Sequence, residues 1–358
     1  MSPAARLPLL AAGFLSLVFG IAAGLVRLGW DIPLPRESFA VLHGPLMACA
    51  FFGTVISLER AVAIGSAWAY LGPLSAGTGG LALIAGAAFP ALLLLATGSA
   101  VFLVASCIVL KRQPHLHNAC LVLGAASWLA GTLLLATGET AYALSPWWIG
   151  FLVLTIAGER LELSRFMPPS PTAKRTFMAI MAGLAVAPAL GWWATAASLL
   201  ALALWLARKD VALRTIRGTG LTRYIAACLL AGYVWLAVAS VIILAGADMQ
   251  PGRPAFDAAL HAIFLGFVFS MVFGHAPIIV PAVFRVPLPY HPTFYVPLAL
   301  LHASLALRVA ADLAGLYDWR GLAGAGNAAA IAVFVASMLI AVIRGRRPAP
   351  APQAGGPR

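Results

Sequence analysis

Two histidines in otherwise apolar segments are the residues of this sequence best suited to metal chemistry. The stretch 258–285, AALHAIFLGFVFSMVFGHAPIIVPAVFR, carries no acidic or basic side chain before its last residue except His261 and His275. A third histidine, His43, opens another apolar stretch near the N-terminus. Ionisable residues in such segments are rare and mark functional sites, and imidazole is a common metal ligand. These histidines therefore predict a cofactor or metal site, provided that the surrounding elements bring the rings together.

The elements that would hold these rings are membrane helices. The chain of 358 residues is 62% hydrophobic and 9% charged, whereas a soluble domain carries about 25% charged residues. Apolar runs of about 20 residues are long enough to cross a bilayer as helices. We expect an all-α, polytopic membrane bundle of about twelve transmembrane helices, at 7–28, 38–58, 68–87, 89–110, 118–138, 143–163, 175–190, 192–207, 222–245, 256–284, 291–313 and 321–343.

The distribution of basic residues predicts the topology. With the N-terminus in the cytoplasm, 18 of the 23 lysine and arginine residues fall on the inner side. This bias satisfies the positive-inside rule, so both termini are predicted to be cytoplasmic. The five basic residues on the outer side are Arg27, Arg36, Arg253, Arg308 and Arg320.

The chain is predicted to form one transmembrane domain, residues 1–343, whose surface contacts the lipid bilayer. Residues 344–358, RGRRPAPAPQAGGPR, contain almost only proline, alanine, glycine and arginine, and we expect a disordered basic cytoplasmic tail. The net charge of +12 does not indicate nucleic-acid binding, because the basic residues are scattered over short loops.

His43 and His261 are predicted to lie at the same depth. His43 is five residues into the helix 38–58, and His261 is five residues into the helix 256–284. Both helices run from outside to inside, so each ring lies about 7–8 Å below the outer end of its helix. Two imidazoles at equal depth in one bundle could bind the two faces of a single haem iron.

The neighbouring residues could support such a cofactor. Gly266 and Ser270 belong to a row of small residues after His261, and this row would accept either a closely packed helix or a flat macrocycle. Arg36 and Arg253 precede the two histidines by seven and eight residues. We expect their guanidinium groups to bind the haem propionates, because arginine suits carboxylates as a bidentate donor.

His275 is too far along its helix to bind the same iron, since fourteen residues correspond to about 21 Å. The histidines that could join it on the inner side, with His302 deeper, are His115, His117 and His291. A second metal centre, for instance copper, could use imidazoles from this set, including His275 and His302. The alternatives to a second metal centre are that these histidines lie in loops or that a proton path includes Glu59 and Glu159.

Arg308 and Asp312, four residues apart, are expected to form a structural ion pair.

Two motifs resemble those of the NnrS family, polytopic haem- and copper-containing membrane proteins linked to nitric oxide stress. The motifs are LHGPLMACAFFGTVISLERA, from Leu42, and LHAIFLGFVFSMVFGHAPI, from Leu260. The architecture is also similar to that of the catalytic subunit of haem-copper oxidases, in which helices two and ten hold a low-spin haem near the outer face. The resemblance implies haem b on His43 and His261, copper as a further cofactor, and a bacterial inner membrane.

The chain departs from both families. Pro45 stands where the NnrS motif has a second histidine, and the predicted sixth helix, SPWWIGFLVLTIAGER, has none. The resemblance therefore implies one haem, used in electron transfer or a nitric oxide response, with a redox partner on the outer face. A proton-coupled secondary transporter that uses Glu59 and Glu159 is the alternative function, and a scaffold with helix-capping histidines is a third.

Overall fold

The computed structural model describes residues 1–33, 35, 37–163 and 170–346, and this part of the chain is helical and contains no strand. Ten long helices are continuous: α1 (Leu7–Val26), α3 (Leu71–Ala85), α4 (Ala88–Arg112), α5 (Leu116–Ala136), α6 (Ala141–Leu163), α7 (Pro171–Leu190), α8 (Trp192–Lys209), α10 (Gly220–Leu244), α13 (Tyr295–Ala314) and α14 (Tyr317–Gly345). The short helices are η1 (Ala4–Arg6), η2 (Glu37–Leu42), η4 (Ala67–Tyr70), α9 (Ala212–Thr215) and η7 (Pro292–Phe294).

Two further rods are composite. In the first, η3 (Pro45–Phe52) continues directly into α2 (Gly53–Ile64). In the second, α11 (Pro254–His261) continues through η6 (Ala262–Phe269) into α12 (Ser270–Phe284).

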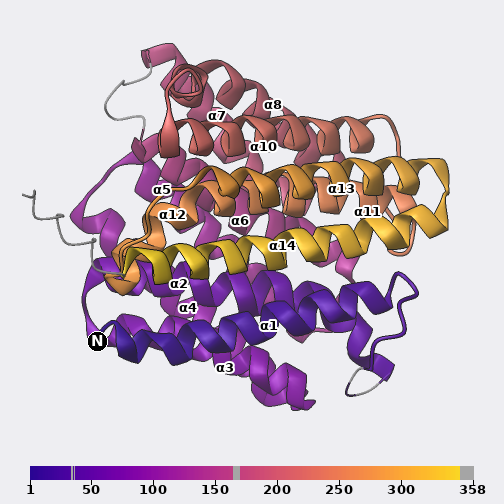
Figure 1. Ribbon diagram of the computed structural model, residues 1–358, viewed down its shortest axis with the longest axis horizontal. Helices are drawn as coiled ribbons and strands as arrows, with labels where there is room; N and C mark the ends of the chain where they lie inside the picture. Colours follow the sequence, from indigo (N-terminus) through magenta and orange to yellow (C-terminus); the bar gives the residue numbers. More distant parts are fainter. Residues whose placement is uncertain (34, 36, 164–169, 347–358) are drawn as a thin grey trace, which may run out of the picture.

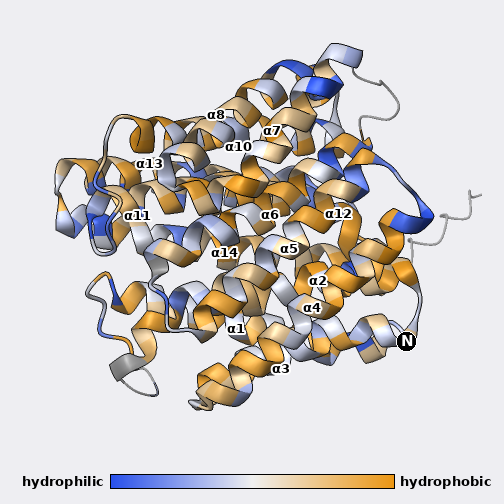
Figure 2. Cartoon of the chain, turned by 180° about the vertical axis from the view of Figure 1, so that it is seen from behind, coloured by the Kyte–Doolittle hydropathy of each residue, from blue (hydrophilic) through white to orange (hydrophobic). Residues whose placement is uncertain are grey.

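The bundle has the surface of a membrane protein. Nine helices of the described chain are long and apolar enough to cross a bilayer. Large apolar side chains in the middle of these helices are exposed, for example Val18 at 59%, Val104 at 52% and Val234 at 62%, where lipid would cover them. Figure 2 shows hydrophobic residues along the helices and hydrophilic residues near their ends.

A helix lies within each of the twelve ranges expected from the sequence. Twelve crossings stay a prediction, however, because α3, α6 and α8 are not among the nine helices that meet the length and hydropathy criteria. The helix α14 extends through Gly345, so the start of the predicted tail is helical. Residues 347–358, the rest of that tail, lie outside the described residues.

Helices that follow one another along the chain pack side by side in most of the bundle, as α3 does with α4 and α13 with α14. The N-terminus and the end of α12 lie at one end of the bundle, where the buried Arg6 donates a hydrogen bond to the carbonyl of Val283. The helix α11 and the connection from α13 to α14 lie at the other end (Figure 1).

The segments η3 and η6 are π-helices of eight residues each. Such helices are rare and are frequently found at functional sites. η3 begins two residues after His43, and η6 begins immediately after His261. The two segments meet through aromatic rings, because the Phe269 ring stacks on that of Phe51 at a centroid distance of 6.2 Å. Each of the two composite rods therefore has a π-helical segment next to one of the histidines, and these two segments contact each other.

Candidate functional site: a cavity between two histidines

The structure brings His43 and His261 together although 218 positions separate them in the sequence. Their ring centroids are 6.2 Å apart, and the ring planes differ by 20°. Both side chains line one cavity of about 570 Å³ at the end of the bundle that carries α11. A cavity of this size is typical of small-molecule and cofactor sites.

Each imidazole is oriented by a backbone carbonyl. Nδ1 of His43 lies 2.7 Å from the carbonyl oxygen of Gly20 on α1, and Nδ1 of His261 lies 2.7 Å from that of Asp257. A carbonyl oxygen can only accept a hydrogen bond, so each Nδ1 carries the proton and each Nε2 keeps a free lone pair. This is the arrangement of metal-binding histidines, which donate their other ring N–H to a carbonyl or carboxylate.

The His43 ring lies against a glycine of α1. A Cβ atom at position 24 would be 2.9 Å from both Cε1 and Nδ1 of His43, which is closer than such atoms normally approach. Gly24 itself lines the cavity. The absence of a side chain at this position therefore allows the ring to reach the Gly20 carbonyl.

The cavity wall is mostly apolar and aromatic. Phe52 and Phe269, which come from the last turns of η3 and η6, contribute to it and contact each other at a centroid distance of 5.3 Å. Trp148 and Phe264 add further aromatic surface. The polar side chains of the wall, besides the two histidines, are Arg27, Glu139, Ser145, Asp257, Arg308 and Asn327. Such a site suits a large apolar ligand with a few polar or charged groups.

A buried charge cluster holds the residue that orients His261. Arg308 donates to Oδ2 of Asp257 at 2.8 Å and to Oδ2 of Asp312 at 3.0 Å. Arg320 pairs with the same two carboxylates. Two acids and two bases neutralise one another, which makes their burial tolerable. The cluster links α11, α13 and α14 and so fixes Asp257, whose carbonyl accepts from His261.

The pair of Arg308 and Asp312 expected from the sequence is thus confirmed, but its other two members were not foreseen. Asp257 is 51 residues away from Arg308 and 63 residues away from Arg320 in the sequence. Asp257 could have been indicated by its place in the first turn of the predicted helix 256–284, where an unpaired charge is unfavourable. Arg320 directly precedes the predicted helix 321–343.

Of the two predicted propionate ligands, only Arg253 lies within the described residues, and it is not at the cavity. The guanidinium of Arg253 pairs with Asp248 at 3.0 Å, its side chain is 65% exposed, and it does not line the cavity. Arg36 lies outside the described residues. The arginines that the structure does place in the wall are Arg27, which is exposed, and Arg308, which is buried.

The small residues after His261 serve helix packing. A Cβ atom at Gly266 would lie 2.4 Å from Cβ of Trp235 on α10. The absence of a side chain at Gly266 therefore leaves room for that tryptophan. Ser270 is fully buried, and neither residue lines the cavity. Of the two readings that the sequence left open, the structure favours the closely packed helix.

His302, predicted as a metal ligand, is half-buried and hydrogen-bonded to protein side chains, and its role as a ligand stays a prediction. Nε1 of Trp235 donates to its Nδ1 at 2.9 Å. Its Nε2 therefore carries the proton in the neutral ring, and this atom lies 3.4 Å from Oγ of Ser270. Nδ1 of His302 is thus occupied by a protein donor, and its Nε2 faces the Ser270 hydroxyl at a longer distance.

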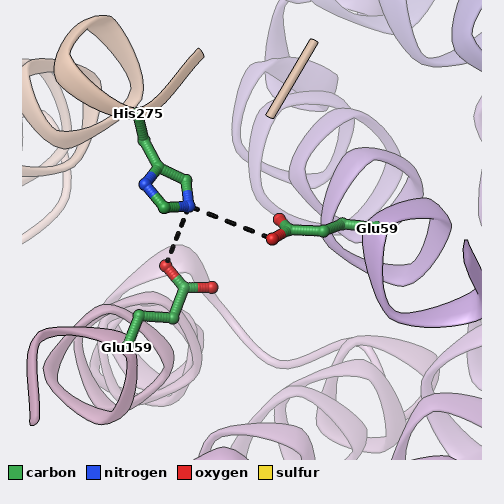
Figure 3. A group of neighbouring side chains, drawn as sticks. All are labelled: Glu59, Glu159 and His275. Atoms are coloured by element: carbon green, nitrogen blue, oxygen red, sulfur yellow. Dashed lines mark ion pairs between the residues drawn. The ribbon is translucent and has the colours of Figure 1, made fainter. Parts of the chain in front are cut away.

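His275 lies toward the end of the bundle that carries the N-terminus, beside two glutamates (Figure 3). Its Nε2 is 3.9 Å from Oε1 of Glu59 and 3.7 Å from Oε2 of Glu159. The other inner-side histidines do not join it in a described ligand group. His115 stacks on His117 at 5.3 Å, and His291 bonds to Thr293.

A family model described as a domain of unknown function, DUF8744, matches residues 6–343, so the chain belongs to that family. No curated protein and no solved structure matches the chain.

Proposed function

We propose that this chain is a bacterial inner-membrane haem protein in which His43 and His261 bind the two faces of one haem b. The observation that carries the proposal is the pair of imidazoles 6.2 Å apart in one cavity, each with Nδ1 bonded to a carbonyl. We assign it a role in electron transfer or in a nitric oxide response, as the resemblance to the NnrS family implies.

The spacing of the rings supports one iron between them. An imidazole nitrogen lies about 2.0–2.1 Å from a metal ion, so two nitrogens on opposite sides lie about 4 Å apart. Adding the distance from each nitrogen to its own ring centre brings the centroids to about 6 Å. The observed 6.2 Å agrees with this value.

The residues of the wall would position the macrocycle. Phe52 and Phe269 would pack against its apolar part, and Arg27 would take the propionate-binding role expected of Arg253. Arg27 lines the cavity and has no ion-pair partner within the described residues, whereas Arg308 is already neutralised by two carboxylates. When bound, a haem with two histidine ligands transfers single electrons and has no open iron position for a substrate.

The expected topology would place this site where a redox partner could reach it. The helix α11, which ends at His261, lies at the end of the bundle opposite the N-terminus (Figure 1). With twelve crossings and both termini in the cytoplasm, that end faces the outer side of the membrane, and a partner would exchange electrons there.

Histidine substitutions test the ligand assignment. In full-length protein purified from cells supplied with haem, His43→Ala and His261→Ala should each lose the haem or convert it to a form that binds carbon monoxide, because one iron position opens. His291→Ala is the matched control, since its ring is exposed and bonded only to nearby Thr293, and it should keep the wild-type spectrum. Wild-type spectra in both cavity variants would reject the assignment.

A second candidate function, proton-coupled secondary transport, draws on the group of Glu59, Glu159 and His275 inside the bundle. A transporter of this kind, unlike the proposed haem protein, requires no cofactor. Haem-free protein that moves a solute against a proton gradient in proteoliposomes would favour it over the haem protein.

A further inference from the structure

Three potential metal ligands converge from three helices that are far apart in the sequence. Glu59 comes from α2, Glu159 from α6 and His275 from α12. One ligand atom of each lies within 4.8 Å of those of the other two. Figure 3 shows the two carboxylates and the imidazole pointing toward a common space. This group lies about 21 Å along the rod from His261 and is separate from the cavity described above.

The imidazole of His275 lies within ion-pair distance of both carboxylates (Figure 3) but beyond the normal length of a hydrogen bond. The distances from Nε2 of His275 to the carboxylate oxygens, 3.9 and 3.7 Å, exceed the length of a hydrogen bond, about 3.2 Å at most for nitrogen and oxygen. The atoms are thus close enough to share a partner and too far apart to satisfy one another.

The excess negative charge of Glu59, Glu159 and His275 favours the binding of a cation. Two carboxylates at this separation, inside a membrane bundle, repel each other. Two arginines, Arg60 and Arg160, act on Glu159 electrostatically, and Arg160 is already engaged in a bidentate pair with Asp210 at 3.0 and 3.1 Å. Protonated His275 would supply only one positive charge against two negative ones. A divalent ion beside a neutral imidazole would balance the group completely.

We propose that Glu59, Glu159 and His275 bind a divalent first-row metal ion. Ligand atoms about 2.1 Å from a metal lie about 3.4 Å apart at tetrahedral angles and about 3.6 Å apart at trigonal angles. The observed 3.7 and 3.9 Å need an inward shift of only a few tenths of an ångström. The site binds the ion between α2, α6 and α12 and so ties these helices together.

The donor set selects the class of metal. Two carboxylates and one imidazole suit Mn²⁺, Fe²⁺ or Zn²⁺, whereas Cu⁺ prefers soft thiolate or thioether ligands. The two carboxylates distinguish this site from the copper centre built from imidazoles that the sequence suggested. The three side chains are 26–31% exposed, so water completes the coordination and the ion exchanges with the solution.

Binding of Mn²⁺ tests the site in the purified full-length protein. After treatment with a chelator, the wild-type chain should remove one equivalent of Mn²⁺ from solution, measured by the loss of the electron paramagnetic resonance signal of the free ion. Glu59→Gln, Glu159→Gln and His275→Gln should each weaken Mn²⁺ binding at least roughly tenfold. Even the loss of a residue that only supports a ligand weakens metal binding by about this factor, and these three residues would be ligands themselves. Glu162→Gln is the matched control, because it removes a carboxylate from the same helix as Glu159 and should bind Mn²⁺ like the wild type.

A second measurement on the wild-type protein does not depend on the folding of variants. Pulsed paramagnetic resonance of the bound Mn²⁺ should show a coupling to one imidazole nitrogen, from His275. Absence of a stoichiometric Mn²⁺ site, absence of the nitrogen coupling, or equal affinity in the ligand variants and Glu162→Gln would overturn the proposal.

Discussion

At position 24, a side chain of a single carbon would meet the ring of His43, so this residue gives a sensitive test of the cavity. In Gly24→Ala the new Cβ would lie 2.9 Å from two ring atoms, and the ring would have to leave the Gly20 carbonyl. We expect roughly tenfold weaker haem binding, because the second-shell bond that orients the ligand is lost. Haem titration of the purified variant measures the effect.

Gly321→Ala is the matched control for this substitution. The nearest atom to a Cβ at that position is 3.6 Å away, which is an ordinary contact, so haem affinity should stay at the wild-type value. Equal affinity in Gly24→Ala and the wild type would contradict the placement of His43 against α1.

The sequence predicted the two histidines but not the groups that orient them. The two histidines lie at the same depth in two helices that run in the same direction, and this was enough to pair His43 with His261. Their Nδ1 partners are backbone carbonyls, and every residue has one, so the carbonyl of Gly20 has no distinguishing mark in the sequence. The partner of Arg253 was not foreseen for a related reason. Proximity along the chain does not show which way a loop side chain turns, and Arg253 pairs with Asp248.

At the scale of elements, the junction of α11, α13 and α14 depends on buried charges. Asp257→Ala would leave Arg308 and Arg320 with a single carboxylate, and Arg308 is only 3% exposed. Breaking a buried pair costs about 3–5 kcal/mol. We expect a loss of this order in the free energy of unfolding in detergent. Haem binding should also weaken, because the disrupted cluster no longer fixes the backbone carbonyl of residue 257 that orients His261.

Asp248→Ala provides the comparison for this loss. Its partner Arg253 is 65% exposed, and exposed pairs contribute about 0–1 kcal/mol, so this variant should unfold nearly like the wild type. Similar stabilities of the two aspartate variants would show that the buried cluster does not hold the junction.

The helices themselves follow from runs of apolar residues, and a helix lies in every expected range. The π-helical segments η3 and η6 could not be predicted in this way. A π-turn differs from an α-turn in hydrogen bonding and not in composition, and both segments contain only apolar residues and glycine. The sequence offered Glu59 and Glu159 only as part of a proton path and His275 as part of a set of histidines. It did not predict that the three converge, because contacts between distant helices leave no periodic pattern.

At the scale of the whole molecule, the orientation of the bundle is the prediction that decides which side carries the histidine cavity. Gln250 and Arg217 are exposed residues that flank opposite ends of α10. With the N-terminus in the cytoplasm, a membrane-impermeant thiol reagent should label Gln250→Cys from the outer side and should label Arg217→Cys only after the membrane is opened. The reverse pattern would place the cavity on the cytoplasmic side and contradict the topology drawn from the basic residues.

The haem content and absorption spectrum of the purified wild-type protein test the central claim most directly. Cells supplied with haem should yield one haem b per chain, with a low-spin spectrum that does not change when carbon monoxide is added, because both iron faces are held by imidazoles. A protein that is correctly folded and remains without haem, or a haem that binds carbon monoxide in the wild type, would contradict the account.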